Sequence, residues 1–426
     1  MMRLARLRGS ARTPEVPTMR PRLAVALVLA SALLAPGAAT AQRGKPVKLG
    51  FAYIFSGTNA IYGQFARQGA ELAIEEVNRQ GGILGRQVEA RFEDEAGKPD
   101  VGIRVVRKLV FDDGVDAVIG LDSSGTAEGV APVMPELETP LIITHAATPH
   151  VTGARCNAWT FRISLSLPQN IAIASTIAAE GKARRWTTVG PDYAFGHESW
   201  EYFKKDLARK KPGVTFVADG EAAFPPSKTT DFSPYITKVM ASDADGVLVS
   251  LWGGNLIDFV KQANELGFFK GKREILMTLG AATEVLTALG DRMPAGLWVG
   301  TRYWFQGSAS PMNKAFVEGY RKKFGVYPSY NAHGAYAAVL AYKAAAEKAK
   351  STDKAAVAKA LEGLAVEVPL GKIVIRAEDH QAVQDGVWGR TAAGKGFDIR
   401  ILEPMRRFPG DAITPPVAET GCKMTR

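Results

Sequence analysis

The chain has 426 residues, a formal net charge of +10 and 46% hydrophobic residues, which is enough for two domains with separate cores. Its five histidines are scattered and no CxxC or HExxH pattern occurs, so neither a metal site nor a cofactor is expected. The positive charge is spread thinly along the chain, which argues against a nucleic-acid partner.

Residues 1–41 have the pattern of a secretory signal peptide. A basic start, Met19-Arg20-Pro21-Arg22, precedes an apolar run over Leu23–Leu34 and the small residues Ala39-Thr40-Ala41. The run is too short to span a membrane, which takes roughly 20 apolar residues. We expect cleavage after Ala41, with Met19 as an alternative start. Because no cysteine stands at the cleavage site, the mature protein is predicted to be free in the periplasm.

The first half of the chain alternates between strand and helix patterns. In the first helix, Ala66, Ala70, Ala73 and Val77 recur on one face. Strands are predicted at Val47–Phe55, Val88–Glu93, Val115–Ile119 and Pro140–Ile143, and helices over Gln64–Asn78, Val101–Phe111 and Thr126–Leu137. Strands separated by helix-length segments form βαβ units, so we expect a parallel sheet.

The same rhythm restarts after Pro168. Strands are predicted at Trp186–Val189, Val214–Ala218, Gly246–Ser250, Glu274–Leu279, Leu297–Tyr303, Lys372–Arg376, Gln384–Gly389 and Phe397–Leu402. Helices are predicted from Pro168 to Gly181 and over Glu198–Arg209, Pro311–Phe324 and Ala332–Lys350. No linker rich in Pro or Ser separates the halves. The sequence therefore predicts an α/β fold with two sheets in lobes joined by crossing segments.

Two loops carry the polar residues of a candidate binding site. Gly120–Gly125 and Ile143–Thr148 each follow a predicted buried strand and end in small hydroxyl residues. Ligands of α/β sheets bind outside the carboxyl ends of the strands. Free backbone N–H groups at helix starts favour an anion there. The two loops together predict one half of a carboxylate-binding cleft.

The two cysteines, Cys156 and Cys422, are expected to form a disulfide, because an exported protein meets an oxidising compartment. Such a bond would fasten the C-terminal tail to the loop after the second ligand-binding strand. Free thiols remain the alternative, since only geometry decides the pairing.

A set of short motifs in order resembles the leucine/isoleucine/valine-binding family, the type I periplasmic substrate-binding proteins of ABC importers. The motifs include Ser56-Gly57, Tyr62-Gly63, Gly81-Gly82-Ile83, Gly120…Ser123-Ser124, Ala146-Ala147-Thr148, Phe161-Arg162, Asp192-Tyr193-Ala194-Phe195-Gly196, Gly253-Gly254 and Asp379-His380-Gln381. The resemblance covers residues 45–405. It implies two Rossmann-like lobes with parallel-type sheets and a three-segment hinge near residues 166, 303 and 384. The N-terminal lobe would comprise 42–165 and 304–383, and the C-terminal lobe 166–303 and 384–426.

The resemblance also implies a ligand site and partners. The ligand's carboxylate would be held by Ser124 or its neighbour Ser123, and by Ala146 and Thr148, with Tyr62 at the border. Helix capping is the competing explanation for Ser124 and Thr148. Arg162 is expected to fasten a loop near the hinge, with a second carboxylate contact as the alternative. The expected partner is an ABC permease in the inner membrane, and the protein is expected to act as a monomer.

One departure from the family pattern bears on the ligand. Amino-acid binders carry an acidic residue just after the strand that matches Glu274–Leu279, and here Gly280-Ala281 follow instead. A buried ammonium without a counter-charge is costly. Bulky residues, Phe195 and Trp252 with Asn255 beside them, suggest a slot for a flat apolar body, although core packing would also explain Trp252.

We therefore expect a small carboxylate ligand, in particular an aromatic acid. A branched-chain amino acid or amide is the alternative, with its ammonium held by Asp122 or by carbonyl groups. Asp122 and His145 flank the site and could read a hydroxyl or amide, or serve only as turn and loop residues. An exported serine hydrolase built from Ser123 or Ser124 with His145 and Asp122 is disfavoured, because no G-x-S-x-G elbow is present. A sensor for a membrane receptor would use the same fold.

Overall fold

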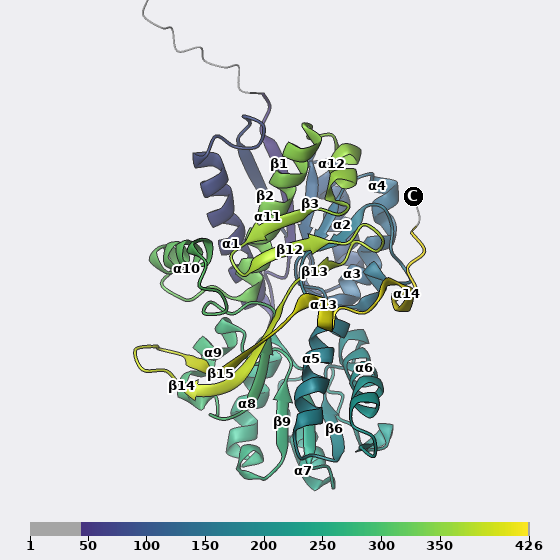
Figure 1. The fold of residues 1–426 in the computed structure, drawn as a ribbon, viewed down its shortest axis with the longest axis vertical. Coiled ribbons are helices and arrows are strands. Elements are labelled where there is room, and N and C mark those ends of the chain that lie inside the picture. Colours follow the sequence, from purple (N-terminus) through teal and green to yellow (C-terminus); the bar gives the residue numbers. More distant parts are fainter. Residues whose placement is uncertain (1–43, 425–426) are drawn as a thin grey trace, which may run out of the picture. The chain divides into compact units, whose positions relative to one another are not determined.

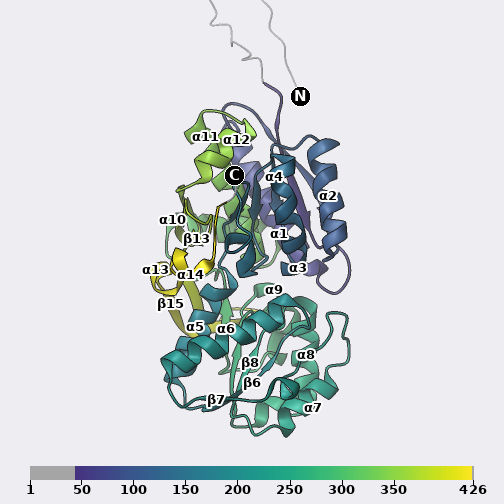
Figure 2. The ribbon, with the colours of Figure 1, turned by 90° about the vertical axis from the view of Figure 1, so that its right-hand side faces the viewer.

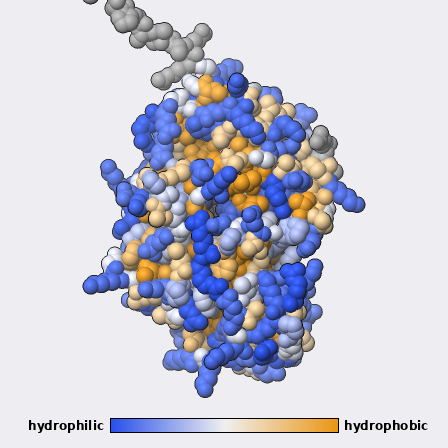
Figure 3. All heavy atoms as spheres, viewed as in Figure 1, coloured by the Kyte–Doolittle hydropathy of each residue, from blue (hydrophilic) through white to orange (hydrophobic). Residues whose placement is uncertain are grey.

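The computed structural model describes residues 44–424, so the predicted signal peptide lies outside the described residues. Within this range no helix combines the length and the apolar character needed to cross a membrane. Large exposed hydrophobic side chains are few and scattered: Leu84, Phe111, Met240, Leu266 and Met405. On the face in Figure 3, hydrophilic and hydrophobic residues are interspersed.

The first sheet has five parallel strands in the order β2-β1-β3-β4-β5. They are β1 (Val47–Tyr53), β2 (Val88–Asp94), β3 (Ala117–Gly120), β4 (Leu141–Ile143) and β5 (Thr160–Arg162). The helices between them are α1 (Ala60–Arg79), α2 (Pro99–Phe111), α3 (Ser124–Val130) and α4 (Met134–Leu137). A second set of helices from the later chain, α10 (Pro311–Phe324), α11 (Tyr330–Ala349) and α12 (Lys354–Leu361), adjoins this sheet.

The strand pattern explains why both faces of this sheet are covered. Successive side chains of a strand point to opposite faces. In β3, Ile119 faces the core shared with α1 and α11, whereas Val118 faces the core shared with α2, α3 and α4. Figure 1 shows these helices beside the strands of the first sheet. In β4, Ile142 and Leu141 divide in the same way. The two-sided burial is why these strands are uninterrupted apolar runs in the sequence.

The second sheet has seven strands in the order β15-β14-β10-β9-β8-β6-β7. The parallel strands are β6 (Arg185–Val189), β7 (Thr215–Phe216), β8 (Gly246–Val249), β9 (Glu274–Met277) and β10 (Trp298–Thr301), and the antiparallel ones at one edge are β14 (Gly386–Ala393) and β15 (Arg400–Phe408). In Figure 2, α5 (Leu167–Glu180) and α6 (Ala194–Lys210) lie on one side of this sheet, and α7 (Ser233–Ala241) and α8 (Gly253–Glu265) on the other. Helix α9 (Thr283–Leu289) follows β9.

A small antiparallel sheet, β11-β12-β13, comes late in the chain and lies beside the first sheet. Its strands are β11 (Ala365–Val368), β12 (Gly371–Ile375) and β13 (Ala382–Val383). An isolated bridge pairs Arg162 of β5 with Gln381, and the amide of Arg162 donates to the carbonyl of His380 at 3.0 Å. The chain then continues into β14 of the second sheet, so it passes from one sheet to the other more than once.

The predicted α/β alternation is confirmed, with several differences in individual elements. The helix predicted over Thr126–Leu137 is divided into α3, a 3₁₀ turn (Ala131–Val133) and α4, because Pro132 and Pro135 lack the N–H that a continuous helix needs. Strand β5 was not predicted, since three residues show no usable periodicity. The strand expected at Val214–Ala218 is reduced to the two residues of β7.

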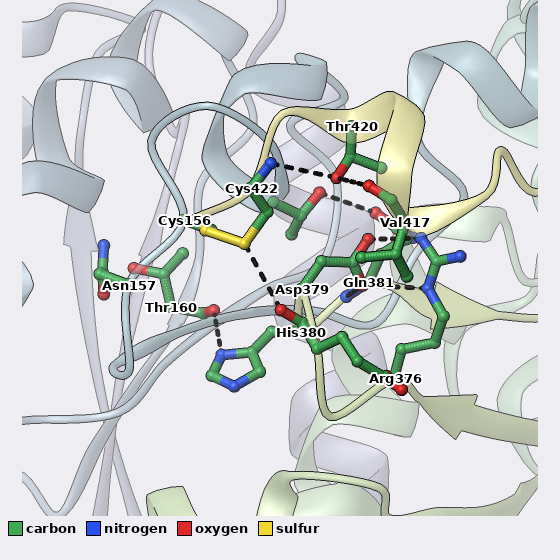
Figure 4. The surroundings of a disulfide bond; sticks show 12 residues. Cys156, Asn157, Thr160, Arg376, Asp379, His380, Gln381, Val417, Thr420 and Cys422 are labelled. Carbon is green, nitrogen blue, oxygen red and sulfur yellow. Dashed lines mark hydrogen bonds and ion pairs between the residues drawn. A yellow bond between two sulfur atoms is a disulfide. The ribbon is translucent and has the colours of Figure 1, made fainter. Parts of the chain in front are cut away.

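The predicted disulfide between Cys156 and Cys422 is present, with a Cα–Cα distance of 5.6 Å across 266 residues of sequence. It joins the loop before β5 to the C-terminal segment after α14 (Val417–Thr420) (Figure 4). Nearby, the ring of His380 contacts the carbonyl of Thr160 at 3.0 Å (Figure 4). The bond therefore fastens the end of the chain where the β12–β13 segment meets β5.

Candidate functional site: a cleft lined from two sheets

A small cavity lies where the carboxyl ends of strands from both sheets meet. Its lining residues come from the first sheet, Asp122, Ser124, His145 and Ala147, and from the second, Tyr193, Phe195, Trp252, Leu279 and Arg302. Each follows a strand within a few residues, as ligand-binding residues of open α/β sheets do. The cavity volume is about 10 Å³, roughly enough for one water molecule.

The loop after β3 is shaped by its glycine. Gly120 has φ +144°, and a Cβ there would lie 2.1 Å from the carbonyl oxygen of Ala52, so only glycine lets β3 lie this close to β1. Leu121 follows with φ +65°. This turn brings Asp122 and Ser124 to the end of the sheet. The amide of Leu121 donates a 2.8 Å hydrogen bond to the carbonyl of Ala52.

Ser124 lies as the sequence predicts, beside the loop after β4. Its Oγ accepts hydrogen bonds from the amides of Ala147 at 3.3 Å and Thr148 at 3.2 Å. Its hydroxyl proton remains available for an acceptor in the cavity. Ser123 is buried next to it, and its amide donates to Glu95 at 3.3 Å.

Thr148 and Ala146 do not line the cavity. The hydroxyl of Thr148 donates to Glu128 at 2.6 Å, and it accepts the amide of His150 as the cap of the 3₁₀ helix Pro149–Thr152. The amide of Ala146 donates to Leu121 at 2.8 Å. These contacts match the capping explanation that the sequence left open for Thr148.

Asp122, His145 and Tyr330 form a buried chain of hydrogen bonds. Asp122 Oδ1 lies 2.9 Å from His145 Nδ1, and His145 Nε2 lies 3.0 Å from the Tyr330 hydroxyl. Burial and the nearby Arg302 hold the pKa of His145 well below its ordinary value, so the ring is neutral. A neutral ring has one donor and one acceptor, which these two partners use up. Asp122 also accepts the amide of Ile54 at 2.7 Å.

The hydrogen bonds of His145 argue against the serine hydrolase alternative. Within residues 44–424, no hydrogen bond joins His145 to Ser123 or Ser124, because both ring nitrogens face Asp122 and Tyr330. A serine nucleophile needs a base within hydrogen-bond reach. His145 is therefore not placed to act as that base.

A second carboxyl, Glu95, lies behind Asp122. Its Oε1 accepts the amide of Asp122 at 2.9 Å. Burial raises the pKa of Glu95, and the charge of Asp122 raises it further. Burial also raises the pKa of Asp122. The pair therefore holds a proton near neutral pH and carries less than two negative charges.

Aromatic side chains close the cavity from the second sheet. Trp252 Nε1 donates to the Tyr193 hydroxyl at 2.9 Å, and the Trp252 ring lies 5.2 Å from that of Tyr62. Phe195 lines the cavity beside Tyr193. Tyr193 and Leu279 were not among the predicted site residues, although Tyr193 stands in one of the family motifs. Asn255 does not line the cavity, and its side chain donates to the carbonyl of Thr229 at 3.2 Å.

Direct hydrogen bonds connect the two sides of the cleft. The Tyr62 hydroxyl of α1 accepts the amide of Gly253 at 3.1 Å, and Asn59 Oδ1 accepts the amide of Gly254 at 3.1 Å. A Cβ on Gly253 would lie 2.3 Å from Asn59 Oδ1, so the Gly253-Gly254 pair permits this close approach. Tyr62 is not itself among the lining residues but packs against Trp252, which is.

Arg302 is another cavity-lining residue that the sequence analysis missed. It follows β10 directly, is 4% exposed, and lines the cavity. One guanidinium nitrogen donates to the carbonyl of His145, and the group lies 5.3 Å from the ring centre of Tyr330. Its Nε is buried without a partner. The signal that identified Ser124, a polar residue just after a buried strand, would also have identified Arg302.

Arg162 has the structural role that was expected for it. Its guanidinium donates to the carbonyl of Thr148, to Thr152 Oγ1 at 2.6 Å and to Gln381 Oε1 at 2.7 Å. It thereby fastens the loop after β4 to the β12–β13 segment.

One group of side chains has the chemistry of metal ligands. Glu128, His150 and Glu198 offer ligand atoms that all lie within 4.8 Å of one another. His150 pairs with Glu198 at 2.9 Å, whereas Glu128 accepts from Thr148 and lies 3.9 Å from Arg155, so each member already has a partner. Nothing further in the described residues points to a cation there.

The family model described as periplasmic binding protein matches residues 46–395. The chain belongs to this family. Leu/Ile/Val-binding protein homolog 4 of Brucella melitensis biotype 1 is 26% identical over 94% of this chain and 97% of its own length. The family consists of periplasmic binding proteins, so the resemblance inferred from the motifs is confirmed.

Solved structures of periplasmic binding proteins share the fold. An amino acid ABC transporter substrate-binding protein from Pseudomonas fluorescens Pf-5 is 26% identical, with a TM-score of 0.77 over 89% of this chain and 100% of that one. A solute-binding protein of an ABC transporter from Rhodopseudomonas palustris BisB5, in complex with 3,4-dihydroxybenzoic acid, is 25% identical, with a TM-score of 0.76 over 87% and 99%. The two-lobed type I fold expected from the sequence is confirmed, and the chain is a substrate-binding protein of the ABC transporter class.

Proposed function

We propose that this periplasmic binding protein captures a small aromatic carboxylate and delivers it to an ABC permease. The observation that carries the proposal is the composition of the cavity. The first sheet offers the hydroxyl of Ser124, and the second offers the cation of Arg302 beside the aromatic rings of Phe195 and Trp252. Hydroxyl and guanidinium groups donate to a carboxylate, and aromatic walls suit a flat apolar body.

The acidic groups around the cavity favour an acid over an amino acid as ligand. Asp122 already accepts from Ile54 and contacts His145, whereas Glu284, on α9 after β9, accepts from Asn331 and does not line the cavity. Asp122 is the one carboxyl that lines the cavity among residues 44–424, and because it is already engaged, burial of an ammonium there would be costly. The relative from Rhodopseudomonas palustris, in complex with 3,4-dihydroxybenzoic acid, adds support for an aromatic acid.

Capture requires the cleft to open. Pockets for small organic ligands hold roughly 300–1,000 Å³, far more than the cavity between these two sheets. The contacts that join its sides, such as Tyr62 with Gly253, would break and form again around the ligand. We propose a hinge near residues 166, 303 and 384, with lobes formed by 42–165 with 304–383 and by 166–303 with 384–426. Hinge closure is an established way to couple binding to a second event.

Within this proposal the residues divide by role. Ser124 and the loop that contains Ala146, Ala147 and Thr148 hold the headgroup, with Ser123 beside them. Tyr62, Phe195 and Trp252 surround the body of the ligand, and Asn255 supports that wall. Asp122 and His145 set the charge and hydrogen-bond pattern beneath it. We further propose that the protein is not an enzyme, acts as a monomer without nucleic acid, and reaches the periplasm by cleavage after Ala41.

A branched-chain amino acid or amide is the second candidate, supported by the Leu/Ile/Val-binding relative in Brucella. Isothermal titration calorimetry of the mature protein with leucine, benzoate, 4-hydroxybenzoate and cinnamate separates the two. We expect at least one aromatic acid to bind and leucine not to bind. Tight binding of leucine without binding of any aromatic acid would contradict the proposed ligand class.

A further inference from the structure

Arg302 is a buried cation without an anionic partner. Among residues 44–424 no carboxylate pairs with it, and its one hydrogen bond from Nη1 goes to the carbonyl of His145. Nε is buried and has no acceptor. A guanidinium presents five N–H donors in a planar fork that matches a carboxylate. Burial of a charge is costly in free energy unless the charge is paired. The unpaired N–H donors of Arg302 are therefore available to an anionic acceptor.

The groups around Arg302 do not supply that pairing. The ring of Tyr330 lies 5.3 Å from the guanidinium and offers only its π face. His145 is neutral and contributes a carbonyl. Asp122 is engaged by Ile54 and His145. Burial lowers the pKa of Arg302, and the charge of Asp122 offsets this only in part.

We infer that Arg302 is the positively charged partner of the ligand's carboxylate and makes the cleft select acids over their neutral amides. This inference rests on the proposed function and names the residue that sets its charge preference. Ser124 lines the same cavity and supplies a neutral hydroxyl donor, so it would orient the headgroup without discriminating its charge.

The test compares 4-hydroxybenzoate with 4-hydroxybenzamide by titration calorimetry on the wild-type protein and on Arg302→Met and Arg302→Lys. Loss of one partner of a buried charge pair weakens binding by roughly 30-fold or more. We expect the acid to bind wild type at least about 30-fold more tightly than the amide, and Arg302→Met to remove most of that difference. Arg302→Lys should retain the preference for the acid with reduced affinity, because it keeps the charge without the fork.

Arg321→Met is the matched control, because Arg321 also lies over an aromatic ring, 4.2 Å from the centre of Tyr327, but is exposed on α10 outside the cavity lining. It should leave both affinities unchanged. The wild-type comparison of acid and amide does not depend on how any variant folds. Equal binding of acid and amide by wild type, or unchanged acid affinity in Arg302→Met, would overturn the inference while leaving aromatic-acid capture intact.

The two proposals fail in distinguishable ways. If wild type binds leucine and none of the aromatic acids, the proposed ligand class is wrong, and leucine with leucinamide then replaces the benzoate pair in the same comparison. If wild type binds none of these carboxylates, the role of Arg302 is wrong as well.

Discussion

Two buried arginines show how differently the same side chain is used in two parts of this molecule. Arg162, at the end of β5, is 1% exposed and has acceptors for its donors on Thr148, Thr152 and Gln381. Arg302, at the end of β10, is 4% exposed and has one carbonyl partner and a bare Nε. The two side chains are similarly buried but differ in their hydrogen-bond partners. We therefore assign Arg162 to stabilising the fold and Arg302 to binding the ligand.

The largest expected effect is on folding, from Arg162→Met. Hydrogen bonds to charged groups contribute about 1.5–3 kcal/mol each, and their loss here would leave several buried acceptors unpaired. We expect the free energy of unfolding in urea to fall by roughly 3 kcal/mol or more. Arg302→Met should leave it unchanged or raise it, because it removes an unpaired buried charge. If both variants lost the same stability, the contrast between the two arginines would be wrong.

The next effect concerns the disulfide. Replacement of both cysteines, Cys156→Ser with Cys422→Ser, should lower stability by about 2–5 kcal/mol, because the bond closes a long loop of the unfolded chain. A shift in the midpoint of thermal unfolding measures it, with the reduced wild-type protein as the comparison. Ligand affinity should stay near that of wild type, because neither cysteine lines the cavity. A large loss of ligand affinity would contradict this prediction and show that the disulfide also shapes the cleft.

A pH-dependent effect is expected from Glu95. Its pKa is raised to about 8 in the folded protein, so its contribution to stability is complete below its unfolded pKa of about 4.3 and is lost as the pH rises toward 8. Glu95→Gln should therefore gain stability relative to wild type between pH 5 and pH 8, by less than about 1.4 kcal/mol per pH unit.

Urea unfolding at several pH values measures this difference. Glu265→Gln, at an exposed position on α8, is the control and should show no trend. A difference between Glu95→Gln and wild type that does not change with pH would contradict the raised pKa.

The smallest effect is expected across the cleft. Tyr62→Phe removes the acceptor of the Gly253 amide and should weaken ligand binding by about 1 kcal/mol, since closure loses one hydrogen bond. Tyr342→Phe is the matched control, because the Tyr342 hydroxyl is buried without a hydrogen-bond partner in the described residues. Calorimetry with 4-hydroxybenzoate compares the two. An equal effect from both variants would remove the assigned role of Tyr62 in closure.

The sequence predicted the fold well because its signals are local. Apolar runs such as Val115–Ile119 and the periodic face of α1 correspond to strands and helices of the structure. The same reasoning predicted a continuous helix through Pro132 and Pro135, where the missing N–H groups break it. Strand β5 depends on its pairing with β4 rather than on its own three residues, so no local pattern revealed it.

The site was predicted less completely, because it depends on which residues meet across the two sheets. Ser124, His145 and Trp252 were identified from their places after strands and in motifs, and they line the cavity. Thr148 has the same local pattern, yet its hydroxyl is turned toward Glu128. Arg302 was not predicted because the pattern used was small hydroxyl residues after strands of the first sheet, whereas Arg302 follows a strand of the second. Its unpaired donors become visible only when both sheets are in place.

The most direct test of the account is a crystal structure of the protein with a bound aromatic acid, such as 4-hydroxybenzoate. The account predicts the carboxylate within hydrogen-bond distance of Arg302 and Ser124, with the ring against Trp252 and Phe195. A carboxylate bound away from both residues, or an amine bound to an aspartate or glutamate in the cleft, would contradict it.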